Sequence, residues 1–181
     1  MLNDNYLSSG ISILDFSPSR SYYHKLKNNS TIDYHSSDLS DNFIAEYKYD
    51  ITNIDCEDSK FDLIICYHIL EHITDDNKAI NELYRILKNE CFCLIQTPFK
   101  EGDIYEDANI IKGEDRLEHF GQEDHVRVYS LEGLKDRLTD NGFNVEIKSF
   151  NEDTNNYYGY SKKCSNLLNV SQGTTCGAFL A

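Results

Sequence analysis

The sequence predicts an α/β domain built around a mostly parallel sheet, and three neighbouring segments carry this prediction. Residues 63–66 (LIIC) form an uninterrupted apolar run, which is typical of a strand buried on both faces. A second such run, Cys91–Thr97, is closed by Pro98 and predicts another strand. Between them, Thr74 or Asp75 can cap a helix, and apolar residues recur at the spacing of an amphipathic helix; they are Ala79, Ile80, Leu83, Ile86 and Leu87. Strand, helix and strand in succession form a βαβ unit, which indicates a layered α/β fold.

Further strands are predicted before this unit. Ile11–Phe16 (ISILDF) is a short apolar run, and the following SPSRS suits a turn that leads into a helix. Ile32–Ser36 alternates weakly between apolar and polar residues, and Ala45–Tyr49 leads to Asp50 as a third candidate strand. The chain therefore alternates strands and helices from its beginning.

A long polar connection, Phe99–Tyr129, follows the unit, and connections of this length are usually functional or disordered. Ser130 then suits the N-cap of a helix that carries Leu131, Leu134 and Leu138 and stops at Gly142, before the alternating strand Phe143–Ile147. Tyr157–Val170 is a candidate last strand in an antiparallel edge hairpin. We expect one domain over residues 1–160 and a weakly patterned tail over 161–181, which can include part of that strand.

Composition excludes several classes of function. The formal net charge is -14, so the general field of the protein repels a nucleic-acid backbone, and we expect no nucleic-acid partner. No apolar stretch is long enough for a membrane helix, and MLNDNYLSSG lacks the pattern of an export signal. The six cysteines form no C-x-x-C pair and suit reduced thiols. We therefore expect a soluble cytoplasmic protein without membrane insertion.

His68, Glu71 and His72 in CYHILEHI form the order H-x-x-E-H, which is the zinc-ligand arrangement of the inverzincin peptidases. On a single helix the two histidines would share a face and could bridge a metal. However, His68 follows a buried strand directly, and the carboxyl ends of such strands are where α/β sheets bind ligands. This position favours a strand end over a peptidase helix. His68 is equally compatible with a functional and a structural role, whereas His72 suits a structural one better.

The order of these pieces resembles that of class I S-adenosylmethionine-dependent methyltransferases over roughly Ile11–Tyr160. The strongest match is KFDLIICYHILEHITDDNKAINELYRILKNECFCLIQTP, which resembles the fourth strand, the following helix and the fifth strand of that family. The matching positions are Phe61, Asp62, Leu70, Glu71, His72, Glu82, Arg85, Leu87 and Lys88. The resemblance implies a Rossmann-like three-layer sandwich with a mostly parallel seven-stranded sheet and an antiparallel last hairpin. It also implies S-adenosylmethionine as the cofactor.

The resemblance places the cofactor at three strand ends. In the family the first strand ends in an acidic residue and a glycine-rich loop, since glycines let the backbone approach the cofactor. Here Asp15 matches the acidic position, but Ser17, Pro18 and Ser19 replace the glycines, and Pro18 lacks a backbone donor. Phe16 and Ser17 are expected beside the cofactor, as is Tyr67 at the end of the strand in FDLIICY.

Two further aspartates match cofactor-binding positions of the family. Asp38 in SSDLSD matches the carboxylate that accepts hydrogen bonds from the ribose hydroxyls, with Leu39 beside it. Asp50 in KYDITNI suits the residue that receives the adenine amino group, and Ile51 would cover the ring. Either aspartate is alternatively a turn residue or helix cap, because aspartate favours those places.

The acceptor is expected at EHFGQEDHVRVYS, residues 118–130, which resembles a run in a subgroup of these methyltransferases linked to glycan or cell-surface synthesis. Methyl transfer requires a base that removes the acceptor proton, and a histidine suits this task. His125, His119 and His68 are the catalytic candidates. Gln122, Asp124 and Arg127 are the substrate-binding candidates, with Arg127 holding either an anionic acceptor or a buried carboxylate. We assign no metal, although His119, Asp124 and His125 form one conceivable ligand set.

These observations favour an S-adenosylmethionine-dependent methyltransferase that acts on a small-molecule or sugar-linked acceptor. The missing glycine loop leaves a second reading, a non-catalytic Rossmann-like binding or scaffold protein. A third reading is a zinc metallohydrolase that uses His68, Glu71 and His72. Cofactor calorimetry distinguishes the first two readings, and metal analysis tests the third.

Overall fold

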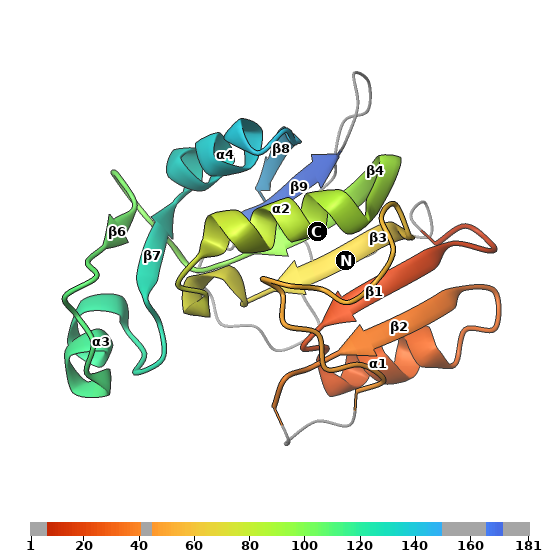
Figure 1. Cartoon of the computed structure of the whole chain (residues 1–181), viewed down its shortest axis with the longest axis horizontal. Helices are drawn as coiled ribbons and strands as arrows, with labels where there is room; N and C mark the ends of the chain where they lie inside the picture. The colour runs from red at the N-terminus through yellow and green to blue at the C-terminus, as the bar shows by residue number, and fades with distance from the viewer. Residues whose placement is uncertain (1–6, 41–44, 150–165, 172–181) are drawn as a thin grey trace.

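The computed structural model describes residues 7–40, 45–149 and 166–171, and within them six strands form the main sheet. Their order is β2-β1-β3-β4-β9-β8 (Figure 1). The strands are β1 (Ser12–Phe16), β2 (Asp33–Ser37), β3 (Phe61–Tyr67), β4 (Leu87–Gln96), β8 (Asn144–Ser149) and β9 (Asn166–Ser171). β2, β1, β3 and β4 pair in parallel, and β9 is antiparallel to both of its neighbours. The mostly parallel α/β fold and its antiparallel last hairpin are confirmed.

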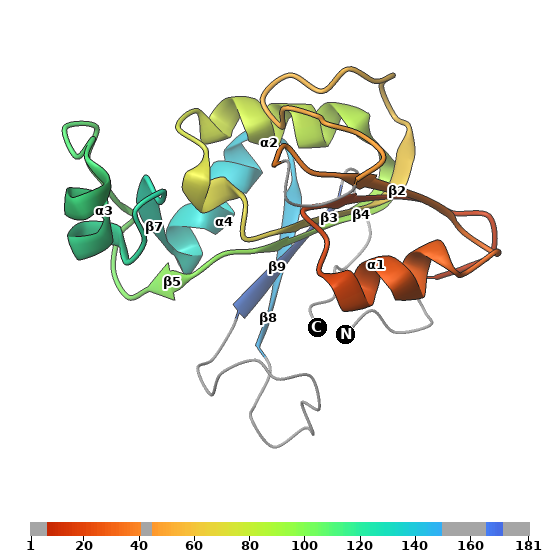
Figure 2. The ribbon, with the colours of Figure 1, turned by 90° about the horizontal axis from the view of Figure 1, so that it is seen from below.

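Helices cover both faces of the sheet, as a three-layer sandwich requires (Figure 2). α1 (Arg20–Lys27) packs on one face, where Leu26 joins a buried cluster with Leu63 and Ile65 of β3. α2 (Asp76–Ile86) and α4 (Leu131–Asp140) pack on the opposite face, over Ile64 and Cys66. Successive β3 side chains therefore enter opposite layers of the core, which explains why residues 63–66 are all apolar.

The predicted helix starts are confirmed at α2 and α4. Asp75 is the N-cap of α2 and accepts a hydrogen bond from the backbone N–H of Lys78, and Ser130 does the same for Gly133 at the start of α4. Such side-chain acceptors satisfy amide groups that the helix itself leaves without partners. After α4, Gly142 takes a φ of 93°, a left-handed conformation that favours glycine.

The third predicted strand, Ala45–Tyr49, is wrong, and the main sheet has six strands among the described residues, not the seven that the resemblance implied. This segment makes only one parallel bridge to the sheet, between Ser37 and Tyr47. Side chains of β2 take the place of a backbone ladder: the hydroxyl of Ser36 accepts from the N–H of Glu46, and that of Ser37 from the N–H of Tyr49. A strand cannot extend where hydroxyl groups occupy its amide donors.

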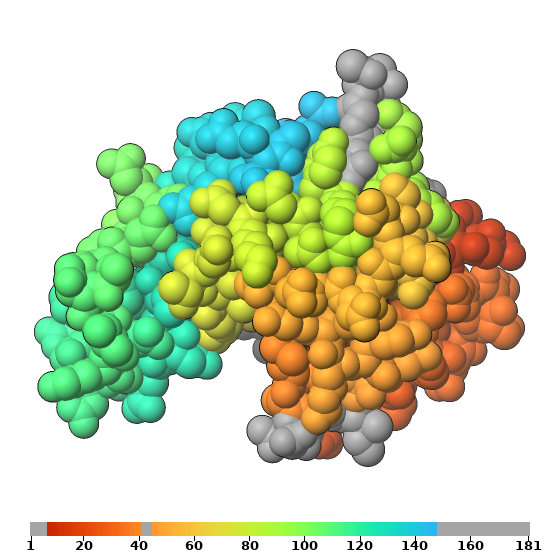
Figure 3. All heavy atoms as spheres, viewed as in Figure 1, coloured from red at the N-terminus to blue at the C-terminus, as the bar shows by residue number. Residues whose placement is uncertain are grey.

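The long connection after β4 contains its own structure, which the sequence pattern did not predict. It holds β5 (Phe99–Lys100), β6 (Tyr105–Glu106), α3 (Gly113–Phe120) and β7 (Arg127–Ser130). The three short strands form a second sheet in the order β5-β7-β6. Figure 3 shows that this region projects as a lobe from one end of the molecule.

β9 lies within the expected tail, which was predicted to include part of the last strand. It is placed between β4 and β8 and pairs with both, so it is an inner strand of the sheet. The remaining residues of the strand predicted in Tyr157–Val170, 157–165, lie outside the described residues. In the described part of the chain, no helix combines the length and the apolar character needed to cross a membrane.

Candidate active site

The connections of the sheet diverge at the carboxyl ends of β1 and β3, the place where an open α/β sheet is expected to have its ligand crevice. The chain leaves β1 through α1 on one face and returns at β2, whereas it leaves β3 through α2 on the opposite face and returns at β4. Neighbouring parallel strands whose connections diverge in this way form the usual ligand crevice of an open α/β sheet. Phe16 pairs with Cys66 across these strands, so Ser17 and His68 follow at the same edge.

Both residues at this edge have left-handed backbones. φ is 48° at Ser17 and 55° at His68. Their amides are held by neighbouring strands, because Ser17 N–H donates to Ser37 O and His68 N–H donates to Gln96 O, each at 2.8 Å. Ser17 thus adopts the conformation for which a glycine is normally selected, and its side chain is exposed. The loop keeps a glycine-like backbone although its sequence has no glycine.

The residues before Ser17 are buried. Asp15 exposes 3% of its surface and accepts a hydrogen bond from the hydroxyl of Tyr34 at 2.9 Å, and Phe16 lies in the core. Burial raises the pKa of Asp15 to about 7, against the opposing effect of the Tyr34 hydrogen bond. Asp15 and Phe16 therefore offer little side-chain surface to the crevice, and a contact there would come from the backbone and from Ser17.

Asp38 lies just beyond the end of β2, next to β1. One carboxylate oxygen accepts from the N–H of Ser40 at 2.7 Å, in a local turn. Within the described residues, its other oxygen has no hydrogen-bond partner, and the residue is half-buried. Its neighbour Leu39 is 59% exposed. Asp38 therefore has a carboxylate oxygen available for a ligand.

Asp50 and Ile51, which were expected to contact adenine, are not placed as the resemblance implied. Asp50 is exposed and accepts from the N–H and hydroxyl of Thr52, which lowers the pKa of its carboxyl and matches the surface-turn alternative. The assignment of Ile51 is wrong in one respect, since its side chain is 2% exposed in the core and has almost no surface with which to cover a ring. Tyr67 is half-buried and packs beside the core cluster on the α1 side.

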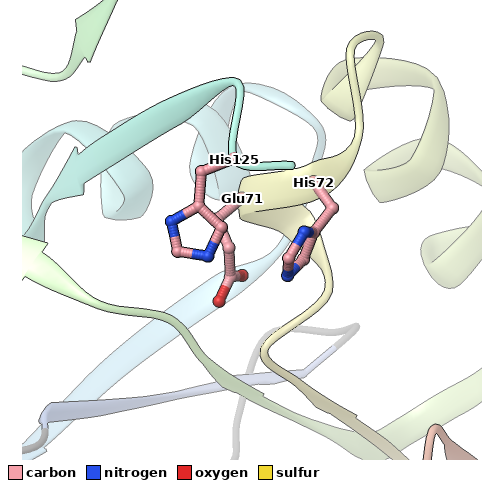
Figure 4. Close-up of side chains that lie close together, drawn as sticks. All are labelled: Glu71, His72 and His125. Carbon is pink, nitrogen blue, oxygen red and sulfur yellow. The ribbon is translucent and has the colours of Figure 1, made fainter. Parts of the chain in front are cut away.

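Three side chains converge where the expected acceptor region, residues 118–130, meets the turn after β3 (Figure 4). Glu71 and His72 belong to a single 3₁₀ turn, η1 (Leu70–His72), and His125 lies between α3 and β7. One potential ligand atom from each lies within 4.8 Å of the other two. The two imidazole rings meet edge to face, with centroids 4.7 Å apart. The figure shows the Glu71 carboxylate between them.

Each member of this cluster is oriented by a further group. His125 Nδ1 lies 3.2 Å from the carbonyl of Phe120, and because a carbonyl only accepts, Nδ1 carries the proton. His72 Nδ1 lies 3.2 Å from Asp124 Oδ2. Glu71 Oε1 lies 3.2 Å from His68 Nδ1, whereas its buried Oε2 has no partner within the described residues.

Backbone contacts fasten the lobe to η1 and so place His125. Val126 N–H donates to Glu71 O at 2.9 Å. Arg127 is 5% exposed and donates to the carbonyls of Leu70, Ile73 and Thr74 and to the Glu106 carboxylate. The substrate-binding assignment of Arg127 is therefore wrong, because its guanidinium is occupied inside the protein. The alternative of a buried structural contact to a carboxylate is the correct one.

The other residues predicted to bind or activate the acceptor are exposed to solvent or lie outside the three-residue cluster. His119 is exposed on α3 and its Nδ1 lies 2.6 Å from the hydroxyl of Tyr105, outside the three-residue cluster. Gln122 is exposed, and Asp124 has 71% of its side chain exposed. His125, by contrast, is only 3% exposed. Of the three catalytic candidates, His68 combines a partly oriented ring with solvent access, since half of its side chain is exposed.

The inverzincin arrangement is not formed. His68 has a left-handed backbone and η1 is a single turn, so His68 and His72 do not lie on one helix. Sequence reasoning assigned no site role to Glu71 outside that motif and favoured a structural one for His72. The motif was the only sequence signal for a cluster at Glu71 and His72. The third member of the cluster, His125, is 53 residues beyond His72, so no sequence spacing connects it to the motif.

Solved structures show the same fold at low sequence identity. A S-adenosylmethionine-dependent methyltransferase from Archaeoglobus fulgidus has a TM-score of 0.66 and 14% identity, covering 93% of this chain and 89% of its own. A possible histamine N-methyltransferase from Thermotoga maritima has a TM-score of 0.63 and 15% identity, covering 94% and 86%. Phosphoethanolamine N-methyltransferase 2 from Haemonchus contortus, solved in complex with S-adenosyl-L-methionine, has a TM-score of 0.63 and 14% identity, covering 93% and 50%.

No curated protein matches the sequence. The family model described as a methyltransferase domain matches residues 3–147, which include the whole parallel part of the sheet, the crevice and the lobe. The chain therefore belongs to this methyltransferase domain family.

Proposed function

We propose that the protein transfers a methyl group from S-adenosylmethionine to a hydroxyl of a small-molecule or sugar-linked acceptor. The observation that carries this proposal is the edge of the sheet just beyond β1 and β3, where Ser17 and His68 follow adjacent parallel strands with left-handed backbones. Non-glycine residues in this conformation are uncommon and gather at functional sites. Family membership and the fold of the solved methyltransferases support the same reaction.

The residues present fit the cofactor. Asp38, beside the end of β1, has one carboxylate oxygen that no described residue bonds, which suits a pair of sugar hydroxyls. Ser17 is exposed just after β1, so its hydroxyl is accessible to a ligand at this edge of the sheet. When bound, the cofactor supplies an electrophilic methyl group on a sulfonium centre. The acidic net charge of -14 is compatible with a cationic ligand of this kind.

His68 is the best-placed proton acceptor. The Glu71 carboxylate holds His68 Nδ1 at 3.2 Å, so an ionised Glu71 fixes the proton on that nitrogen and leaves Nε2 as the acceptor. Glu71 is 1% exposed, whereas half of the His68 side chain is accessible to an acceptor molecule. A base oriented in this way by a carboxylate removes the acceptor proton as the methyl group is transferred.

The acceptor assignment follows from charge and exposure. Gln122 and Asp124 are exposed on the lobe and are available for hydroxyl groups of a substrate. A nucleic acid is excluded from the proposal because the net charge repels a polyanion. The likeness of residues 118–130 to glycan-linked methyltransferases supports a sugar-linked hydroxyl.

Isothermal titration calorimetry with S-adenosylmethionine tests the cofactor site. We expect Asp38→Ala to weaken binding by about 1.5–3 kcal/mol, the contribution of hydrogen bonds to a charged group. Asp107→Ala is the matched control, because Asp107 also accepts from a local backbone amide, that of Asn109, but is exposed on the lobe. Equal affinities of the Asp38 variant and the wild type would contradict the assignment. No binding to the wild type at millimolar cofactor would favour the scaffold reading.

A further inference from the structure

We propose that Glu71, His72 and His125 form a binding site for a first-row transition-metal dication, of which zinc is the ion to test. Two imidazole nitrogens and one carboxylate oxygen are the ligand set of many zinc and non-haem iron sites. One ligand atom from each residue lies within 4.8 Å of the other two. Atoms bound tetrahedrally to one zinc ion lie about 2.0–2.2 Å from it, and hence about 3.3–3.6 Å apart. Side-chain rotations that move these atoms by about 1 Å would bring the cluster to that spacing.

The second observation is an unpartnered carboxylate oxygen. Glu71 is 1% exposed, and its Oε2 has no hydrogen-bond partner within the described residues. A buried polar atom without a partner costs roughly 1–3 kcal/mol, more when it is charged, so such atoms usually have an ion or water bound to them. Because the two histidine rings flank this carboxylate, an ion bound there would also contact imidazole nitrogens.

The groups around the cluster orient it for metal binding. Metal-binding histidines usually donate their other ring N–H to a carbonyl or carboxylate, which leaves the remaining nitrogen free for the ion. His125 Nδ1 donates to Phe120 O at 3.2 Å, and His72 Nδ1 lies 3.2 Å from the Asp124 carboxylate. Within the described residues, neither Nε2 atom makes a hydrogen bond, so three lone-pair-bearing atoms converge.

The ligand set discriminates among ions. Magnesium and calcium prefer oxygen ligands and keep their waters, so a site with two nitrogens and one oxygen should bind them weakly. Three protein ligands leave at least one coordination position open, as in catalytic zinc sites. In the proposed methyltransferase this open position would hold an acceptor oxygen near His68. That consequence rests on the proposed function, whereas metal binding itself does not.

The test uses the full chain, stripped with a chelator and titrated with Zn²⁺ and, separately, with Mg²⁺. We expect one zinc ion per chain and at least about 100-fold weaker magnesium binding. Glu71→Gln and His72→Ala should each weaken zinc binding more than about 100-fold, and Asp124→Ala about 10-fold, since groups that orient a ligand contribute less than the ligand. His119→Ala is the matched control, an exposed histidine of the same lobe that lies outside the cluster.

Two controls keep the outcome decisive. Thermal melts of the metal-free variants show whether they fold, and His72→Ala serves if the buried Glu71 variant does not, because His72 has 29% of its side chain exposed. Co²⁺ substitution distinguishes the cluster from thiol sites, since Cys56, Cys66, Cys91 and Cys93 are free. We expect a cobalt spectrum without thiolate charge-transfer absorption. The proposal is overturned if folded Glu71→Gln or His72→Ala binds zinc as tightly as the wild type, or if the cobalt-loaded protein shows thiolate absorption. It is also overturned if the wild-type protein binds no zinc.

Discussion

At the scale of single residues, the buried carboxylate of Asp15 makes the stability of the fold depend on pH. It lies on the α1 side of the sheet with Tyr34, almost without solvent contact. Desolvation disfavours its ionised form, and the hydrogen bond from Tyr34 recovers only part of this cost. A pKa of about 7 in the folded state exceeds the unfolded value of about 3.8, so the folded protein holds this proton more tightly than the unfolded chain.

The stability of the protein should therefore change between about pH 4 and pH 7. In this window the unfolded chain has released the Asp15 proton and the folded protein retains it, so the free energy of unfolding falls as pH rises, by up to about 1.4 kcal/mol per pH unit. Asp15→Asn removes this dependence while keeping an acceptor for Tyr34. Urea unfolding of both proteins at several pH values measures it, and parallel pH profiles of the two would contradict the prediction.

His68 is the residue on which the proposed proton transfer depends. His68→Gln removes the base but keeps a polar side chain, so we expect turnover to fall about 10²- to 10⁴-fold, the usual contribution of a general base. Binding of S-adenosylmethionine should stay unchanged. Transfer of labelled methyl groups to a panel of sugar and phenol acceptors measures turnover. His24→Gln, an exposed histidine on α1, is the control, and equal rates in the two variants would contradict the role of His68.

At the scale of elements, an ionic cluster fixes the lobe to α2 and α4. Asp76, in the first turn of α2, is 3% exposed and accepts from the hydroxyl of Tyr129 and the guanidinium of Arg137. Arg127 lies 3.5 Å from the same carboxylate and also bonds to Glu106. Opposite charges and hydrogen bonds thus satisfy each buried group of the cluster. The position of His125 beside η1 depends on this attachment, because Arg127 follows it by two residues.

Removing Asp76 should destabilise the fold strongly. Asp76→Ala removes the buried carboxylate from between Arg127 and Arg137, which keep only the partly exposed Glu106 as an anionic partner, and removes the carboxylate acceptor of the Tyr129 hydroxyl. Breaking a buried pair on one side costs about 3–5 kcal/mol. Glu132→Gln is the control, since its pair with Lys135 is largely exposed and such pairs contribute about 0–1 kcal/mol. Urea denaturation measures both. Similar losses in the two variants would show that the cluster contributes no more than a surface pair.

At the scale of the whole molecule, β9 connects the parallel strands to β8. It is antiparallel to both neighbours, so its backbone donors and acceptors face β4 on one side and β8 on the other. Without β9, the edge of β4 would present unpaired backbone groups to solvent or to other chains. The segment 166–171 is therefore part of the domain and not an appendage of it.

Leu168 provides a test of this position, because it pairs with Ile95 of β4 and Ile147 of β8. Leu168→Pro removes a backbone donor from an inner strand, whereas Leu168→Ala shortens the side chain and keeps the donor. We expect the proline variant to be less stable than the alanine variant by about 3 kcal/mol or more. The difference between their free energies of unfolding isolates the backbone contribution. No difference would mean that β9 does not pair on both sides.

Local patterns in the sequence predicted much of the fold. Hydrophobic periodicity and helix capping are short-range properties, so a few consecutive residues are enough to recognise them. The sequence therefore predicted the apolar run of β3, the apolar stripe of α2 and the capping residues Asp75 and Ser130. The position of His68 at a strand end followed from the same logic. The failed strand at Ala45–Tyr49 shows the limit, since side-chain hydroxyls of β2 displaced its ladder.

The sequence by itself determined the layered α/β class, the family resemblance and the strand ends at which ligands are expected. Only the tertiary structure decided that His125 meets Glu71 and His72, that Arg127 is occupied inside the protein, that Ile51 is buried and that β9 is an inner strand. These features join segments that are far apart along the chain. Their placement depends on packing and on buried hydrogen bonds, which no local pattern of residues encodes.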